Sequence, residues 1–411
     1  MAHEMTRREW LIGSLGAAGM LAGRRWPSLR AAEDWLPARL GPDRSKQAPA
    51  SPVAIQRCES YEPQLVRRKL DEALNLIGGI AKMVSGKTVT VKLNLTGGPG
   101  KLAGLPAYRT YHVHPHVVAA LCAALDDAGA KRIILAESTY SRKPFEEVYG
   151  NAGWDIAAIR SAGGHRVVFE DTRHRGKHPS YSRLKVAWGG YIFPAFDVHP
   201  CYDKTDVFIS LAKLKDHASA GVTMAVKNLF GIPPSSLYGN DAPNEDSTSN
   251  RMAILHHGKR TVPSGVPAEV DHKLPADARW RVPRVTADTL GARPIDLSII
   301  DGIESNRGGE GPWVRGVEPI QPKLLFAGLN PVSTDAIATA AMGYDPQAAH
   351  HEFPFQGENH LLLLAAVGAG AIDPRRIEVR GLPLEKAVHP FNPRRLPVKA
   401  ASAEKPCRAI A

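Results

Sequence analysis

Short apolar runs recur along the chain, and each one ends at a polar residue or a glycine-rich turn. Residues 88–93 (TVTVKL) are followed by Asn94, and residues 132–136 (RIILA) are followed by Glu137. Between them, residues 114–129 open with His-Pro, repeat apolar residues at helical spacing and close on glycine. This order predicts a strand, a helix and a second strand, which together form a βαβ unit of a parallel sheet.

The same pattern returns in the second half of the chain. Residues 206–211, 297–300, 323–328 and 377–381 are predicted strands, and a helix capped by Asn330 follows the third of them. The fold class that this pattern predicts is α/β, with a mostly parallel sheet, flanking helices and Rossmann-like βαβ units.

Composition divides the chain into segments. Residues 1–32 are predicted to be a signal peptide, 33–54 a linker, 55–381 the α/β domain and 382–411 a tail. Within the domain, residues 232–294 are rich in Pro, Asp and Asn and show little periodicity, so they are predicted to form a Pro-rich insertion or lid.

The N-terminus resembles a bacterial twin-arginine export signal. Arg7 and Arg8 precede a short apolar stretch, residues 11–23, that is rich in Gly and Ala. This stretch is shorter than the roughly 20 residues that a membrane-spanning helix needs. We therefore expect the twin-arginine export machinery as a partner and a periplasmic or exported location. An uncleaved N-terminus that stays at the membrane, and a buried helix with a chance Arg pair, are the alternatives.

Composition limits the possible ligands. The formal net charge is +11, but no Lys/Arg run is interleaved with aromatic residues, so no nucleic acid is expected as a partner and small anionic ligands fit better. The four cysteines are far apart in the sequence and form no CxxC motif. An iron–sulfur cluster is therefore not expected, and a divalent metal or a phosphorylated cofactor stays possible.

Polar residues after the predicted strands are candidates for a ligand site, because open parallel sheets bind ligands beyond the carboxyl ends of their strands. The predicted ligand-binding residues are Asn94, Lys213, Lys215, Asn228, Asn330 and Asp335. Glu137 and Asp301 also follow strands, and Asp301 with Glu310 could offer carboxylates to a metal.

Residues 213–231 (KLKDHASAGVTMAVKNLFG) place three lysines and a histidine among small side chains. Small residues let a backbone approach a ligand closely, and nearby lysines suit phosphate or carboxylate groups. His217 is predicted to act as a general acid or base, and Lys227 is predicted to be catalytic beside it. In the alternative interpretation, this segment packs tightly against the sheet and its lysines are solvated.

Three further groups contain metal-ligating residue types, but a structural or solvated role is the favoured interpretation of each. These groups are His112–His116, His199–Asp203, and His350 with His360.

Several longer motifs resemble the DUF362 family in order and wording. They are VKLN (91–94), HPHVVAALCAALDDAGA (114–130), TDVFISLAKLKDHASAGVTMAVKNLFGI (205–232), IDLSIIDGIESNRGGEGP (295–312) and AGLNPVSTDAIATAAMGYD (327–345). The resemblance covers roughly residues 55–380 and implies an α/β fold without naming a reaction. Many family members carry an appended ferredoxin-like cluster domain, whose cysteines this chain lacks.

A fainter resemblance concerns His217 and Lys227. Their order, with small residues between them, is similar to the N-terminal domain of nickel-pincer lactate racemase-like proteins. That resemblance implies a catalytic histidine and a lysine that holds the pincer nucleotide. The chain departs from the pattern at Glu137, near which the second catalytic histidine would fall, and only His256 or His257 could match the metal-ligating histidine by position.

The function predicted from these features is an exported enzyme that acts on an anionic or phosphorylated small molecule or cofactor through a Lys/His pocket, with possible metal assistance. The alternative is a non-catalytic periplasmic binding or carrier protein that uses the same pocket.

Overall fold

A computed structural model describes residues 36–392 of the chain. Their centre is an eight-stranded sheet with the order β16-β1-β15-β12-β9-β2-β5-β6. The strands are β1 (Val53–Arg57), β2 (Thr88–Lys92), β5 (Arg132–Glu137), β6 (Val167–Asp171), β9 (Val207–Lys213), β12 (Leu297–Gly302), β15 (Leu324–Gly328) and β16 (Val379–Gly381). Only β15 runs against the others, which confirms the predicted α/β class with a mostly parallel sheet.

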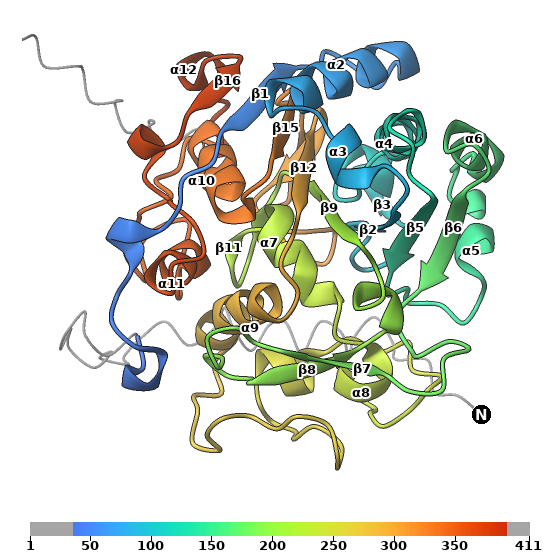
Figure 1. Cartoon of the computed structure of the whole chain (residues 1–411). Helices are drawn as coiled ribbons and strands as arrows, with labels where there is room; N and C mark the ends of the chain where they lie inside the picture. Colours follow the sequence, from blue (N-terminus) through green and yellow to red (C-terminus); the bar gives the residue numbers. More distant parts are fainter. Residues whose placement is uncertain (1–35, 393–411) are drawn as a thin grey trace, which may run out of the picture. The chain divides into compact units, whose positions relative to one another are not determined.

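Helices cover both faces of the sheet. Figure 1 shows α2 (Pro63–Leu76) and α4 (Pro115–Asp127) on one side of it. On the other side lie α7 (Met224–Asn228), α9 (Ala278–Ala292), α10 (Pro331–Ala341) and α11 (His360–Ala366). The sheet is therefore the middle of three layers, and its strands are apolar on both faces, as expected for a covered parallel sheet.

Local sequence explains where two of these helices begin. In α4 and α10, proline occupies the first helical position, where no backbone N–H is needed. The residue before each proline caps the helix: His114 accepts the His116 N–H, and Asn330 accepts the Ser333 N–H at 2.9 Å. These capping positions agree with those expected from the sequence.

The structure does not confirm residues 232–294 as a separate Pro-rich insertion or lid. They contain α8 (Ser235–Tyr238), the π-helical turn η6 (Met252–His256) and the whole of α9. Helix α9 contacts α7 and α11 and is buried around almost its whole circumference. A helix buried on all sides has no polar face, so its sequence shows no amphipathic period, and Pro283 within it adds a misleading breaker signal.

The segments assigned as linker and tail also pack on the domain where they are described. The Arg39 guanidinium donates to the carbonyl oxygens of Gly190 and Tyr191 at 2.8 and 2.9 Å. Beyond β16, helix α12 (Leu384–Ala387) is followed by a 2.7 Å hydrogen bond from the His389 N–H to the Ala341 carbonyl. Arg7 and Arg8 lie outside the described residues. From residue 36 to residue 392, none of the helices combines the length and apolarity that crossing a bilayer demands.

Candidate functional site

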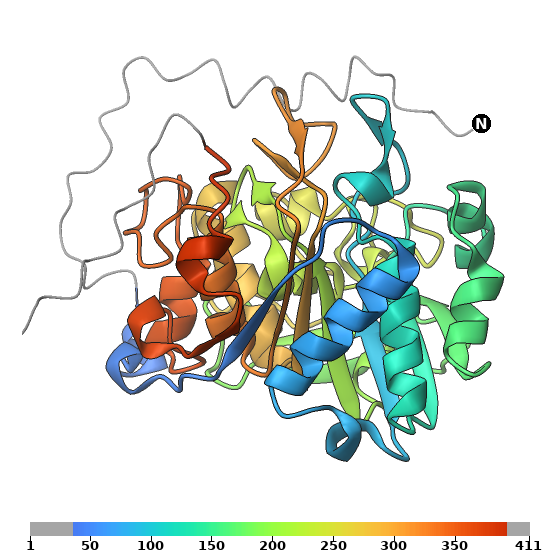
Figure 2. The same ribbon diagram turned by 90° about the horizontal axis from the view of Figure 1, so that it is seen from above.

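The carboxyl ends of four neighbouring parallel strands meet at one edge of the sheet. Figure 2 shows this edge at the top, where the hairpins β3–β4 (Lys101–Leu102 and Leu105–Pro106) and β13–β14 (Ser305–Arg307 and Glu318–Ile320) project from it. Asn94, Glu137, Lys213 and Asp301 all follow or end strands at this edge. The structure thus brings together four of the polar residues that the sequence placed at strand ends.

Asn330 lies elsewhere, so its expected place in the same crevice is wrong. It follows β15, and Gly328 at the end of β15 pairs with Ser298 near the start of β12. Because β15 is antiparallel, its carboxyl end reaches the opposite edge of the sheet. There Asn330 caps α10, and its side-chain amide donates to the Ala369 carbonyl at 2.9 Å.

A buried ion pair between Lys92 and Glu137 joins the ends of β2 and β5. The Lys92 Nζ lies 2.6 Å from the Glu137 Oε1, and both side chains are almost fully enclosed. Glu137 also accepts the N–H groups of Leu95 and Ser138. Burial lowers the pKa of Lys92, and Glu137 opposes that change. Lys92 was not among the predicted site residues. It ends the sequence TVTVK, whose alternating apolar and polar residues are typical of a strand with one exposed face.

A second buried ion pair joins Lys213 and Asp301 at 2.9 Å. Each Asp301 oxygen accepts two donors: Oδ1 takes the Tyr61 hydroxyl and the Ile303 N–H, and Oδ2 takes Lys213 and the His114 N–H. Because both Asp301 oxygens already accept two hydrogen bonds each, the predicted role of Asp301 as a metal ligand does not fit. Asp301 instead neutralises Lys213.

Asp335 and Asn228 position α7. The two Asp335 oxygens accept the Ala225 and Val226 N–H groups at 2.9 and 2.8 Å, which holds the first turn of this short helix. Burial raises the pKa of Asp335 to about 8, although both N–H groups oppose the rise. Asn228 bonds to Asn94 at 2.9 Å and to the end of β2. Both residues therefore orient α7, which carries Lys227.

Three buried cations at this edge have no carboxylate partner among residues 36–392. The Lys215 amine donates to the carbonyl oxygens of Tyr111 at 2.6 Å and Glu310 at 3.3 Å. Arg251 donates to neutral oxygens only, among them the Ser138 hydroxyl at 2.6 Å. Lys227 has no hydrogen-bond acceptor in this part of the chain, and its Nζ lies 4.0 Å from the centre of the Phe230 ring.

The charge balance around Lys227 is positive. Its charged neighbours are Glu310, Arg251 and Lys92, and Lys92 is already paired with Glu137. Burial, together with the neighbouring cations, lowers the pKa values of both Lys215 and Lys227 to about 7, and Glu310 opposes this. An anion placed beside Lys227 would remove the imbalance.

His217 is a neutral hydrogen-bond donor. Its Nδ1 accepts the N–H groups of Ser219 and Ala220 at 3.1 and 3.3 Å, so the ring proton resides on Nε2. Burial, with Lys227 and Lys215 nearby, lowers its pKa to about 3. The expectation that His217 exchanges protons near neutral pH is therefore wrong for the protein without a ligand.

Glu310 borders His217, with 3.8 Å between its Oε2 and the His217 Nδ1. Its oxygens accept the Ala218 N–H at 2.9 Å and the Trp313 indole N–H at 3.0 Å. Burial opposes ionisation of Glu310, but His217 and these two donors together keep its pKa low. Each oxygen accepts one donor within the protein, and the predicted metal-ligand role of Glu310 stays a prediction.

Two further histidines lie beside Lys227: His256, which the sequence offered only as a positional match to a metal-ligating histidine, and His360. Burial and the nearby Lys227 and His217 lower the pKa values of both His256 and His360. His360 is fully buried, so its assignment to a solvated surface is wrong. The apolar run LLLL that follows His360 was the sequence signal that His360 is buried. Arg251 and His256 lie in the region that was predicted to be an insertion or lid.

The first of the other histidine groups matches its favoured structural interpretation, and the second stays open. His112 bonds to the Thr96 carbonyl, His114 caps α4, and His116 bonds to the Tyr61 carbonyl. His199 lies with Glu170 and His178 in a possible metal-binding group. Its Nδ1 accepts the Cys201 N–H at 3.1 Å, and its Nε2 lies 3.3 Å from a Glu170 carboxylate oxygen.

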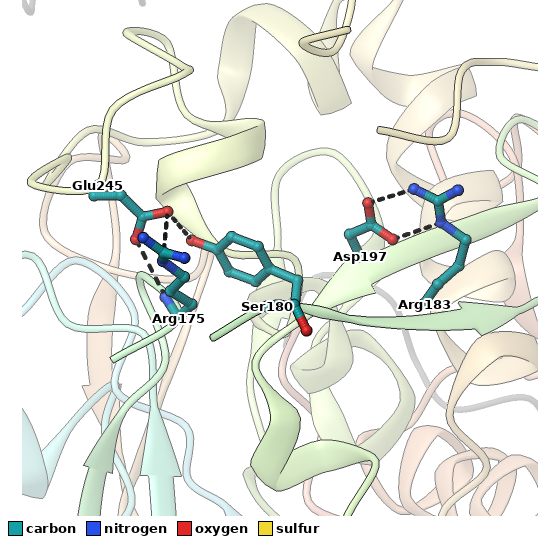
Figure 3. A pocket seen from close by; sticks show the side chains of 6 residues that line it. Arg175, Ser180, Arg183, Asp197 and Glu245 are labelled. Atoms are coloured by element: carbon teal, nitrogen blue, oxygen red, sulfur yellow. Dashed lines mark hydrogen bonds and ion pairs between the residues drawn. The ribbon is translucent and has the colours of Figure 1, made fainter. Parts of the chain in front are cut away.

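A separate cavity of about 440 Å³ lies away from this site. Figure 3 shows that its charged side chains turn toward each other: Arg175 faces Glu245, and Arg183 forms a bidentate ion pair with Asp197. Because each charge is already paired, this cavity lacks the unsatisfied charge that marks the Lys227 region.

Comparison with known proteins places these residues in a family. The model of the domain of unknown function DUF362 matches residues 89–340, which is more than half of the chain and includes the whole 213–231 segment. The chain belongs to the DUF362 family. The thylakoid-associated protein sll1697 of Synechocystis sp. is 26% identical over 295 residues, or 72% of this chain and 75% of that protein. The resemblance to nickel-pincer racemases stays a prediction.

We predict opposite stability effects for two buried lysines. Lys92→Met should lower the free energy of unfolding by about 3–5 kcal/mol, because it leaves the Glu137 carboxylate buried without its cation. Chemical denaturation at pH 7 measures this. Glu137→Gln combined with Lys92→Met should recover part of the loss, and a harmless Lys92→Met would contradict the ion-pair assignment.

Lys227→Met should instead stabilise the protein without ligand, by on the order of 5 kcal/mol at pH 6. The folded pKa of Lys227 is lowered to about 7 from the ordinary 10.5, so its protonation opposes folding fully below pH 7. This cost fades as the pH rises from 7 to 10.5, and the difference between variant and wild type should shrink over that range. Exposed Lys131→Met is the control, and a destabilised Lys227→Met protein would show that a protein partner holds Lys227.

Proposed function

We propose that this DUF362 protein is an enzyme that acts on an anionic or phosphorylated small molecule or cofactor, and that Lys227 holds the anion beside His217. The observation that carries the proposal is the buried Lys227 amine, which has no acceptor within residues 36–392. A buried ammonium without a counter-charge is costly, and proteins retain such groups mainly where a ligand supplies the missing charge.

Two other cations support an anionic ligand. Lys215 and Arg251 are also buried with neutral acceptors only, so the surplus of positive charge extends over several side chains. Lysine and arginine together suit the several oxygens of a phosphate or carboxylate. The carboxylates Glu137 and Asp301 cannot serve as counter-charges, because Lys92 and Lys213 already occupy them.

The proposed division of roles differs from the one expected from the sequence. With a pKa of about 7 in the protein without ligand, Lys227 takes up a proton as the anion binds and is then the better acid. His217 presents its neutral Nε2–H and can donate a hydrogen bond to an oxygen of the ligand. A neutral imidazole in this role stabilises developing negative charge without titrating.

Export through the twin-arginine machinery is part of the proposal. Arg7 and Arg8 support it, and the Synechocystis relative is named for its association with thylakoids, which are membranes. Native mass spectrometry of protein purified from its own source should reveal a retained ligand. Turnover of that ligand that His217→Ala abolishes would support the enzyme, and tight binding without turnover would indicate the carrier protein instead.

Sulfate is a suitable probe of the anion site, since it stays doubly charged between pH 5 and 9. Lys227→Met should weaken sulfate binding about 10- to 100-fold, the worth of one charge-assisted hydrogen bond. For the wild type, affinity should be constant well below pH 7 and should fall at least tenfold per unit above it, because Lys227, and Lys215 where it contributes, must take up a proton to bind.

Isothermal titration calorimetry measures both effects, with Lys131→Met as the control. Arg251→Met should also weaken binding but should leave the pH dependence in place. Sulfate binding that neither Lys227→Met nor Arg251→Met changes would remove the basis of the proposal.

A further inference from the structure

A cavity of about 420 Å³ opens beside His217. Three parts of the chain line it: the β10–β11 hairpin (Asp216–His217 and Gly221–Val222), the loop between β13 and β14, and the segments around residues 344–356 and 391–392. Its volume suits a small organic molecule. His217 belongs both to its wall and to the residues around Lys227, so this side chain links the cavity to the buried lysine.

One wall of this cavity is aromatic. Tyr344, Phe353 and Phe391 line it, and their rings pack edge to face, with centroids 5.3 Å apart for Tyr344 and Phe353 and 6.5 Å apart for Tyr344 and Phe391. Pro354 adds to the apolar surface. Aromatic walls of this kind bind flat rings by stacking and edge contacts.

A carboxylate faces the same space. The Asp216 Oδ1 accepts the Tyr344 hydroxyl at 3.0 Å, and its Oδ2 accepts the Gly308 N–H at 2.7 Å. A carboxylate oxygen can accept two hydrogen bonds, so each keeps room for a donor from a ligand. Burial raises the pKa of Asp216 to about 6, which marks it as a carboxylate that lacks a strong cationic partner.

The nearby charged groups do not fill that role. Arg307 bonds to Glu318 at 2.7 Å on the rim of the cavity, and Glu310 is turned toward Ala218 and Trp313. Gly308 has a φ of 86°, and an added Cβ there would lie 2.9 Å from the Gly316 carbonyl oxygen. Glycine therefore allows the backbone to reach Asp216 and fixes the carboxylate toward the cavity.

We infer that this cavity is the recognition pocket for the uncharged part of the ligand: a flat ring with N–H or O–H donors that bonds to Asp216 and packs on Tyr344, Phe353 and Phe391. The inference rests on the proposed function, because the anionic end of the same ligand binds at Lys227. The substrate class is then a phosphorylated or carboxylated compound with a donor-bearing planar ring, and Asp216 is a specificity-determining residue.

Phosphonates test this assignment, because they separate the two ends of such a ligand. Methylphosphonate carries the anion alone, benzyl- and 2-phenylethylphosphonate add the ring at two distances, and their 4-amino derivatives add a donor. We expect at least one ring compound to bind wild-type protein tenfold or more tightly than methylphosphonate, and its amino derivative to bind more tightly again, as measured by calorimetry.

Two variants should remove these gains separately. Gly316→Asn narrows the cavity, and asparagine tolerates the φ of 80° at a position with open space around it, so it should abolish the gain from the ring. Asp216→Asn replaces one acceptor oxygen by a donor and should abolish the gain from the amino group. Both variants should bind methylphosphonate as wild type does.

The outcomes distinguish the two proposals. Lys227-dependent binding of methylphosphonate with no gain from any ring overturns the cavity assignment and leaves the proposed function standing. Ring binding that depends on Asp216 but not on Lys227 overturns the claim that one ligand reaches from the cavity to Lys227. No binding of any phosphonate to the wild type overturns both proposals.

Discussion

The Lys92–Glu137 ion pair closes the carboxyl edge of the sheet between β2 and β5, and its 2.6 Å contact is almost completely enclosed. Lysine and glutamate can be buried here only because each satisfies the other and because backbone groups of Leu93, Leu95 and Ser138 complete their hydrogen bonds. The Lys213–Asp301 pair repeats this solution two strands away. Together the pairs use the Glu137 and Asp301 carboxylates, and Glu310 offsets only part of the charge of Lys227, Lys215 and Arg251, so positive charge is in surplus.

The small side chains between His217 and Lys227 serve both geometry and electrostatics. Gly221 has a φ of 79°, and a Cβ on it would lie 2.6 Å from the Phe355 ring, so the hairpin packs closely against the segment before α11. The same tight turn aims the Ser219 and Ala220 N–H groups at the His217 Nδ1. Tight packing and ligand binding, which the sequence offered as alternatives, are thus compatible: packing fixes the ring by its Nδ1 and leaves the Nε2–H for other partners.

Most strands were predictable because parallel strands in a covered sheet are continuous apolar runs with clear turn signals. β9 and β12 extend the predicted ranges by two residues, and the β2–α4–β5 unit has the predicted order. β1 was missed because it follows an irregular segment, and β6 because it is a short, partly exposed edge strand. Strand direction was not encoded in these patterns, which is why Asn330 was placed at the wrong edge.

The site residues that come from one continuous segment were predictable from the sequence. Those that come from distant segments were not. Lys213, His217 and Lys227 are close in sequence, whereas Arg251, His256 and His360 reach them through tertiary packing that no local pattern reveals. Residue type alone also assigned the proton chemistry to His217, since imidazole titrates near neutral pH in water. Burial changes which of the two groups titrates near neutral pH. It lowers the pKa of His217 to about 3, and it lowers the pKa of Lys227, which lies beside other cations, to about 7. In a pocket with this surplus of positive charge, the lysine becomes the group that titrates, and an arriving anion is what restores its proton.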